Sequence, residues 1–243
     1  MLFGDFEQQY REYANAKFAI LPVPYDATST WVKGADKGPE AFLDASFTLE
    51  NYDVETGTEA YKHGIATLPF VTEDRTPELL CNKVQQEVTT LLNDGKFPVT
   101  IGGNHTVSIG AIRAMAKKYD NLTVLQLDAH SDLRPSYEGS ELNHACVMNR
   151  AAEVAKITQV GIRSQCVEEL PFCEKERLFY AHQIFDNNQW QAKAIDTLTE
   201  NVYVTIDLDV FDPSVLPSTG TPEPGGLTYY QVLHFLRSVC ANR

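Results

Sequence analysis

Three residues with metal-binding side chains occupy every second position of one short segment. They are Asp128, His130 and Asp132 of LQLDAHSD, where an apolar stretch ends. In an extended segment successive side chains alternate between faces, so residues i, i+2 and i+4 point the same way. The spacing therefore predicts two carboxylates and an imidazole gathered on one side of the chain.

Two other apolar segments end in the same kinds of side chain. Asp207 and Asp209 of VTIDLDVFD repeat the i, i+2 spacing, and His105 ends IGGNH, after two glycines that would allow close backbone approach. Clustered carboxylates repel one another unless cations neutralise them, so we expect two divalent ions. Carboxylate and imidazole without thiolate suit manganese, and also nickel, cobalt, iron or zinc. Two ions roughly 3.5–4 Å apart lower the pKa of a shared water, which predicts hydrolysis.

The elements that must position these residues alternate along the chain. Apolar segments predict strands at 18–24, 97–103, 122–128 and 201–210, and helical periods or caps predict helices at 76–95 and 106–119. The alternation continues through 144–155, 157–163, 167–176, 178–181, 188–200 and 227–240. It predicts a three-layer α/β/α fold with a mainly parallel central sheet. In such sheets the functional site lies beyond the carboxyl ends of the strands, where all six residues fall.

Composition limits the class of protein. With 243 residues, 43% of them hydrophobic and 22% charged, one domain over 1–243 is expected. No apolar run is long enough to span a membrane and the N-terminus lacks the order of a signal peptide, so we expect the cytoplasm. A net charge of −13 argues against nucleic acid and favours small cationic partners. Five irregularly spaced cysteines predict reduced thiols.

The motifs GGNHT, LDAHSD and TIDLDVFDPSVLPSTGTPEPGG together resemble the ureohydrolase family of arginases and agmatinases. The resemblance runs from VPYDATSTWVKGADKGPEAFLDAS to the end of the chain. It implies an arginase-like fold, a homo-oligomer (a trimer or hexamer) and a site for two Mn²⁺ ions. The implied ligands are His105, Asp128, Asp132 and Asp207 at one ion and His130, Asp128, Asp207 and Asp209 at the other. Asp132 would also orient a metal-bridging hydroxide that attacks the guanidinium carbon.

The resemblance also bears on the substrate. DLRPSYEGSELNHACVMNR and TPEPGG are similar to the prokaryotic agmatinase versions of these regions, which favours hydrolysis of agmatine to putrescine and urea. His144 matches a family histidine that passes a proton to the leaving amine, a role suited to a group titrating near neutrality. Thr221 matches a residue that lines the site, and Glu223 would contribute to the pocket.

Other interpretations remain open. Arg134 could meet a substrate carboxylate, which would favour arginine or guanidinobutyrate. Cys146 could form a Cys–His pair for covalent catalysis, although a buried thiol fits better. Thr221 and Glu223 could be turn residues. A metal-binding family member without catalysis is the alternative of a different class.

Two departures from the family pattern are visible. Asn104 stands where the family usually has Asp or Glu, and losing that charge is expected to alter metal affinity or metal choice. The chain also ends before the family's C-terminal strand and helix. If the sequence is complete, we expect impaired folding or activity, because a missing central strand leaves backbone groups unpaired.

Overall fold

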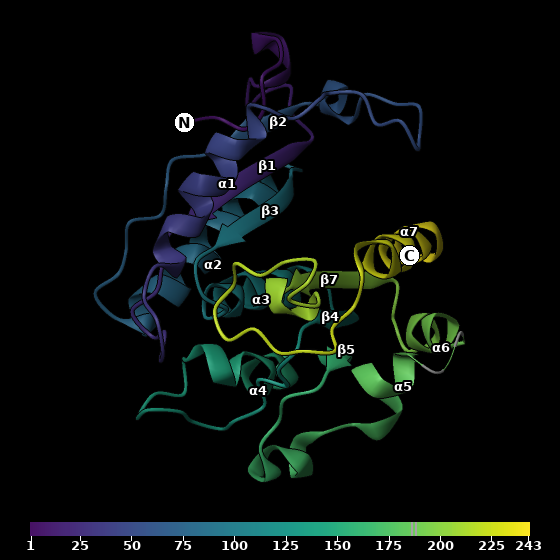
Figure 1. The fold of residues 1–243 in the computed structure, drawn as a ribbon. Coiled ribbons are helices and arrows are strands. Elements are labelled where there is room, and N and C mark those ends of the chain that lie inside the picture. Colours follow the sequence, from purple (N-terminus) through teal and green to yellow (C-terminus); the bar gives the residue numbers. More distant parts are fainter. Residues whose placement is uncertain (186, 188) are drawn as a thin grey trace. The chain divides into compact units, whose positions relative to one another are not determined.

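The structure is a computed structural model that describes residues 1–185, 187 and 189–243. The chain packs as two compact units, Met1–Ala114 and Met115–Arg243. Figure 1 shows both, coloured from the N-terminus to the C-terminus. The expectation of a single domain over 1–243 stays a prediction.

The first unit contains a parallel sheet of three strands in the order β2-β1-β3. The strands are β1 (Phe18–Val23), β2 (Ile65–Thr67) and β3 (Phe97–Gly102). β1 has a neighbouring strand on each side and is buried at all but its first residue, whereas every residue of the edge strand β3 is at least partly exposed. Strand β2 has only three residues and was not predicted.

Helices α1 (Gly38–Ser46) and α2 (Pro77–Asn93) pack against this sheet. The side chain of Thr76 caps α2 by accepting a hydrogen bond from the Leu79 N–H, and Pro77 takes the first helical position. Helix α3 (Val107–Lys118) begins in this unit and ends in the second. It approaches α2 so closely that a Cβ on Gly110 would lie 2.4 Å from the Cys81 carbonyl oxygen.

The second unit contains a parallel sheet of four strands in the order β6-β5-β4-β7. The strands are β4 (Leu122–Leu127), β5 (Lys156–Ile162), β6 (Leu178–Tyr180) and β7 (Asn201–Ile206). Leu127 at the end of β4 pairs with Ile206 at the end of β7. Asp128 and Asp207 are therefore the first residues beyond two adjacent strands that end level.

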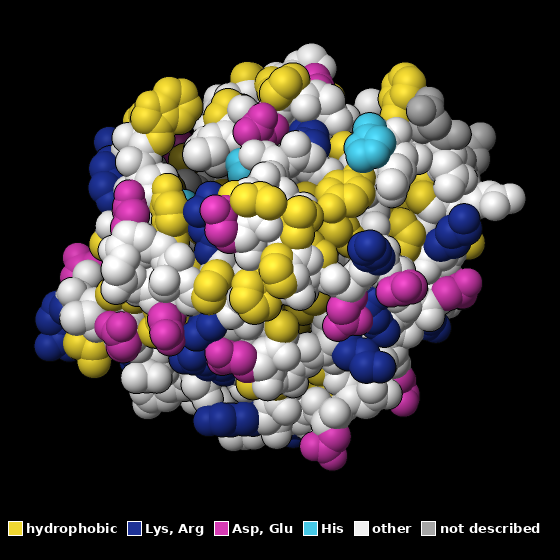
Figure 2. Space-filling model, turned by 90° about the horizontal axis from the view of Figure 1, so that it is seen from below, with side chains coloured by type: hydrophobic (Ala, Val, Ile, Leu, Met, Phe, Trp, Pro, Cys, Tyr) yellow, Lys and Arg dark blue, Asp and Glu magenta, His cyan; other side chains and the backbone are white. Residues whose placement is uncertain are grey.

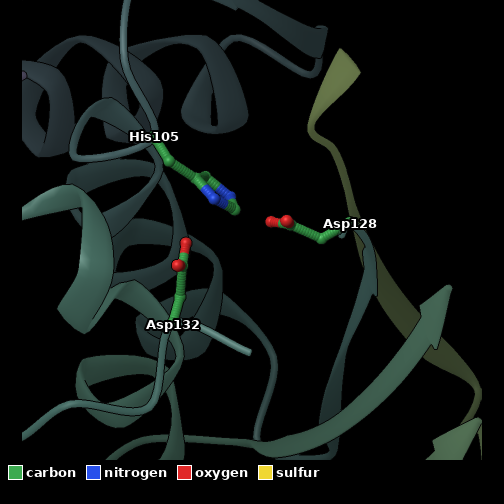
Figure 3. A group of neighbouring side chains, drawn as sticks. All are labelled: His105, Asp128 and Asp132. Atoms are coloured by element: carbon green, nitrogen blue, oxygen red, sulfur yellow. The ribbon is translucent and has the colours of Figure 1, made fainter. Parts of the chain in front are cut away.

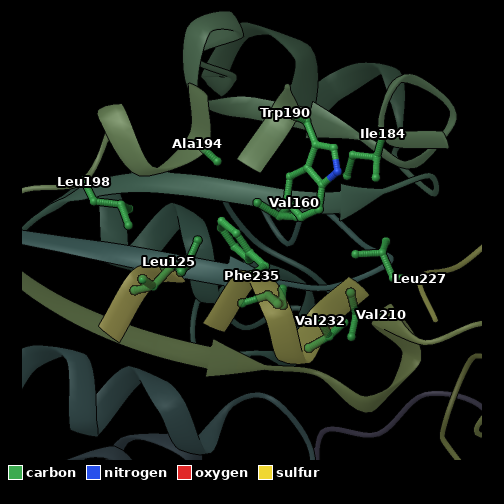
Figure 4. Packing of buried hydrophobic residues seen from close by; sticks show 12 residues of the cluster. Leu125, Val160, Ile184, Trp190, Ala194, Leu198, Val210, Leu227, Val232 and Phe235 are labelled. Carbon is green, nitrogen blue, oxygen red and sulfur yellow. The ribbon is translucent and has the colours of Figure 1, made fainter. Parts of the chain in front are cut away.

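One hydrophobic cluster joins this sheet to the helices on one face (Figure 4). The helices are α5 (Ala181–Phe185), α6 (Trp190–Asp196) and α7 (Tyr229–Asn242). Trp190 and Phe235 lie at the centre, with ring centroids 4.8 Å apart. Of the helix expected at 188–200, residue Asn188 lies outside the described residues.

Helix α4 (Val147–Ala152) packs against β5, and Figure 1 shows it on the opposite side of the strands from α5, α6 and α7. Val147, Met148 and Ala151 are its buried residues. Parallel strands with helices on both faces confirm the predicted α/β class. The expected helix at 144–155 is shorter than predicted and begins as a 3₁₀ turn, His144–Cys146.

No helix among the described residues is both long and apolar enough to cross a membrane. All five cysteines are free, as predicted. On the face in Figure 2, acidic side chains lie among basic and hydrophobic ones.

Candidate metal centre

The segments after β4 and β7 bring three of the predicted ligands together. Ligand atoms of Asp128, His130 and Asp209 lie within 4.8 Å of one another. The backbone holds them there, because the His130 N–H donates to Asp128 Oδ1 (2.7 Å) and the Ala129 N–H donates to Asp209 Oδ1 (3.0 Å). Asp128 and Asp209 are almost fully buried.

The electrostatics of this group favour a cation. Burial would lower the pKa of His130, but the carboxylates of Asp128 and Asp209 outweigh it and raise that pKa to about 11. His130 Nδ1 lies 2.9 Å from Asp209 Oδ2. Burial and then the charge of Asp128 raise the pKa of Asp209 to about 6. The carboxylates thus favour a positive charge at His130. A divalent ion bound by the two carboxylates and the neutral imidazole would supply that charge in place of the proton.

Asp132 lies near this group in an uncommon backbone conformation. One of its carboxylate oxygens lies within 4.8 Å of one from Asp128, and Figure 3 shows both side chains. Its φ of 51° is in the left-handed region, which costs a non-glycine residue about 1–2 kcal/mol. Its carbonyl oxygen accepts hydrogen bonds from the N–H groups of Met148 (2.9 Å) and Asn149 (3.2 Å) at the start of α4.

Asp207 and His105 complete the predicted set. The Asp207 side chain accepts a hydrogen bond from the Asp209 N–H (3.2 Å) at the start of the 3₁₀ turn Leu208–Val210. His105 belongs to the first unit, three residues after the end of β3, and is 9% exposed. Five of the six predicted ligands thus lie in the second unit. The ligand role of all six stays a prediction.

The glycines before His105 permit close backbone packing, as the sequence suggested. A Cβ on Gly103 would lie 2.0 Å from the Tyr25 carbonyl oxygen. Asn104 uses both ends of its amide: Nδ2 donates to Thr28 Oγ1 (2.9 Å) and Ser29 Oγ (3.1 Å), and Oδ1 accepts from the Thr106 N–H (3.1 Å). The amide therefore links the backbone next to His105 to the side chains of Thr28 and Ser29.

His144 follows Asn143, whose side chain caps the 3₁₀ turn by accepting from the Ala145 N–H (3.1 Å). Its ring meets that of Tyr137 edge to face, with centroids 6.0 Å apart. The neighbouring Cys146 is fully buried, and burial, followed by the charge of Asp132, raises the pKa of its thiol to about 11. Because the thiolate is the nucleophilic form, a thiol that is rarely ionised suits covalent catalysis poorly. Cys146 is therefore better explained as a buried structural residue.

Glu223 and Thr221 lie in the loop after β7. Glu223 Oε1 is 3.9 Å from His130 Nε2, which places the carboxylate beside the candidate centre. Thr221 is exposed and has a φ of 50°, unusual for a β-branched residue. A substrate-binding role for Thr221 stays a prediction.

Four residues that the sequence analysis did not select contact the candidate centre's backbone or side chains: Gln126, Gln159, Glu169 and Arg163. Gln126 and Gln159 could have been noticed in the sequence, because each is a polar amide within a mainly apolar strand. Glu169 and Arg163 could not, since surface loops contain such residues routinely.

Comparison with known proteins places this geometry in a family. Residues 16–243 match the model of the arginase family. An N(1)-aminopropylagmatine ureohydrolase from Synechocystis sp. is 42% identical over 236 residues, covering 93% of this chain and 77% of that protein. An agmatinase from Pyrococcus horikoshii is 33% identical, with 96% and 82% covered.

A solved structure agrees. The agmatine ureohydrolase of Thermoplasma volcanium superposes with a TM-score of 0.85 at 31% identity, over 93% of this chain and 78% of that one. The arginase of Bacillus subtilis shares the fold, with a TM-score of 0.78 at 23% identity.

Proposed function

Because the chain belongs to the arginase family, we propose that it is a binuclear-metal ureohydrolase that releases urea from agmatine or from an agmatine carrying an additional amine. The observation that carries the proposal is the buried cluster of Asp128, His130 and Asp209. Family membership makes the chain a hydrolase of amidine carbon–nitrogen bonds. The acidic cluster supports a site for cations.

The proposed ligands are His105, Asp128, His130, Asp132, Asp207 and Asp209, with Mn²⁺ as the expected metal. Two divalent ions would supply Lewis acidity and a water of lowered pKa. Burial of Asp128 and Asp209 keeps bulk water from screening their charge, so the residues would hold the ions tightly.

The protein's own groups would handle the substrate. Asp132 would accept a hydrogen bond from the attacking water and orient it. His144 would donate a proton to the leaving amine nitrogen, for which an imidazole is suited near neutral pH. Glu223, beside His130, would attract the cationic end of a substrate, and Thr221 would line the same side.

The identity of the amine tail has two candidates. Agmatine is favoured by the agmatinase relatives and by the sequence of residues 132–150. Its N(1)-aminopropyl derivative is the second, because the 42% identical relative bears that name. In both candidates the amines outside the guanidino group are protonated and cationic at neutral pH. Such substrates suit a chain of net charge −13.

The proposal is tested by measuring urea release from the Mn²⁺-loaded protein with agmatine, N(1)-aminopropylagmatine, arginine and guanidinobutyrate, each at several concentrations. We expect turnover of one of the first two, lost after chelation and restored by Mn²⁺. Turnover only of arginine or guanidinobutyrate would contradict the amine substrate. Two bound ions with no turnover on any compound would favour a non-catalytic metal-binding protein.

A further inference from the structure

Three polar residues are buried behind the segment 128–133, on the sheet face that points away from the hydrophobic cluster. Gln126 is fully buried on β4, Gln159 is 2% exposed on β5, and Glu169 is 4% exposed in the 3₁₀ helix Val167–Phe172. On β4, Leu125 and Leu127 belong to the hydrophobic cluster, so the intervening Gln126 points the other way.

The two glutamines form a chain of hydrogen bonds that ends on a candidate ligand. Gln159 Nε2 donates to Gln126 Oε1 (2.6 Å) and to the Ser131 carbonyl oxygen (2.8 Å). Gln126 Nε2 donates in turn to Asp128 Oδ2 (2.7 Å) and to the His130 carbonyl oxygen (3.1 Å). Because the Gln126 amide oxygen accepts from Gln159, the NH₂ group of the same amide is the end that faces Asp128.

Glu169 holds the far end of the same segment. Its Oε1 accepts from the Ser131 hydroxyl (2.8 Å) and the Leu133 N–H (2.8 Å). Its Oε2 accepts from the Cys166 N–H (2.8 Å). Every contact of the carboxylate is therefore with a donor, and an amide at this position would turn its NH₂ group toward one of them.

A buried polar network in which each group has a partner allows one arrangement of its members, because any other leaves a group unsatisfied. This network contacts residues 128, 130, 131 and 133, the segment that carries three of the predicted ligands. Partners of metal ligands set ligand orientation, and their loss typically weakens metal binding about 10–100-fold.

We propose that Gln126, Gln159 and Glu169 are positioning residues that hold residues 128–133 in the conformation required for metal binding. Gln126 orients the Asp128 carboxylate through Oδ2, while Gln159 and Glu169 fix the backbone between His130 and Leu133. The inference rests on the proposed function, since it assigns these residues to the same metal centre.

The alternative explanation is that the network stabilises the sheet without affecting metal binding. Thr123 offers a matched control, because it is fully buried on β4, at the other end of the strand from Gln126. Its hydroxyl lies 2.8 Å from that of Thr199 and accepts from the Thr199 N–H (3.2 Å). Thr123→Val removes buried hydrogen bonds without touching residues 128–133.

The test measures Mn²⁺ affinity by calorimetry, without substrate, for the wild-type protein and for Gln126→Met, Glu169→Gln and Thr123→Val. Methionine keeps the length of Gln126 but neither donates to Asp128 nor accepts from Gln159. We expect Gln126→Met to bind Mn²⁺ about 10–100-fold more weakly and Glu169→Gln to be weaker by a smaller factor. Thr123→Val should keep wild-type affinity, although its melting temperature falls.

The electron paramagnetic resonance spectrum of the bound Mn²⁺ gives a second readout that a loss of stability alone would not move. At saturating metal, we expect Gln126→Met to change the signal of the two bound Mn²⁺ ions and Thr123→Val to leave that signal unaltered. Should Gln126→Met fail to fold, Glu169→Gln decides by the same two measurements.

The outcomes separate the two hypotheses. Unchanged affinity and spectrum in the variants, with two ions bound by the wild type, would overturn the positioning role and leave the proposed function standing. A wild-type protein that binds no Mn²⁺ pair would overturn both.

Discussion

The segments that follow β4 and β7 are held in place in different ways. Residues 128–133 are fixed by buried side chains that reach them from neighbouring elements. Residues 212–226 are held mainly by hydrogen bonds to Arg163 and Asp212. The bonds of Arg163 are mostly partly buried, and those of Asp212 are mostly exposed. The predicted ligands within residues 128–133 and the predicted substrate loop are therefore held by different side chains.

Arg163 explains how the second segment keeps its place. Its guanidinium donates to the carbonyl oxygens of Asp209 (2.6 Å), Glu223 (2.8 Å) and Pro224 (3.1 Å). These bonds fix the peptide groups of the loop rather than its side chains. The loop sequence can therefore vary while its path is kept, whereas the network behind residues 128–133 specifies side chains.

The largest effect is expected from Asp128→Ala, which removes a predicted ligand of both ions. Losing several kcal/mol of transition-state stabilisation corresponds to a fall in urea release of about 10³-fold or more. Urea production at saturating Mn²⁺ checks this, with Thr123→Val as the control. Substantial activity in Asp128→Ala would mean that the segment after β4 is not the metal centre.

Arg163→Lys should disturb the other segment. A lysine cannot reproduce the fork of donors, so we expect the free energy of unfolding to fall by about 1–3 kcal/mol. Hydrogen exchange should rise in residues 212–226 and stay unchanged in 128–133. Arg177→Lys is the matched control, since Arg177 pairs with Glu174 and Thr158 away from this loop. Faster exchange in both segments would show that they are not independently held.

Glu223→Gln probes the contact between the two segments. The change keeps the size of the side chain and removes a charge 3.9 Å from His130 Nε2. We expect KM for the cationic substrate to rise about tenfold, as for the loss of a charged hydrogen bond, with a smaller change in kcat. Steady-state kinetics against the exposed control Glu141→Gln measure this. A fall in kcat at constant KM would contradict a binding role.

The smallest effect is a pH dependence at Asp212. Hydrogen bonds from Ser214, and from the N–H groups of Gly225 and Gly226, lower its pKa from 3.8 to about 2. A lowered folded-state pKa adds stability that is present above 3.8 and lost as the pH falls toward 2. The difference in stability between the wild type and Asp212→Asn should therefore shrink on acidification. Urea denaturation from pH 5 to pH 2 tests it, and a constant difference would exclude this cause.

Much of the fold followed from local sequence patterns. The apolar residues of α2 fall on one face as the period predicted, and β1, β4 and β5 match their apolar segments. Three helices and strands were missed: β2 and α5 are too short to show a period, and α1 begins with Gly-Pro and has only nine residues. Short elements of this kind depend on packing against neighbours that the sequence does not reveal.

The candidate centre shows the same division. Alternation along a strand was enough to bring Asp128 and His130 to one side, but not to indicate that Asp209 Oδ2 would contact His130 Nδ1. The left-handed conformation of Asp132 was also hidden, because nothing in its side chain requires it. Contacts such as Glu169 with Leu133 join residues far apart in sequence, so they follow from the fold and not from any motif.

The exposed strand β7 has a consequence for the behaviour of the protein in solution. Among the described residues β7 pairs only with β4, and its side chains Val204 and Ile206 are 36% and 42% exposed. Apolar side chains that face water on a strand favour contact with other apolar surfaces. We therefore expect that replacing Val204 with lysine would raise the solubility of this chain, as a solubility measurement at increasing protein concentration would show.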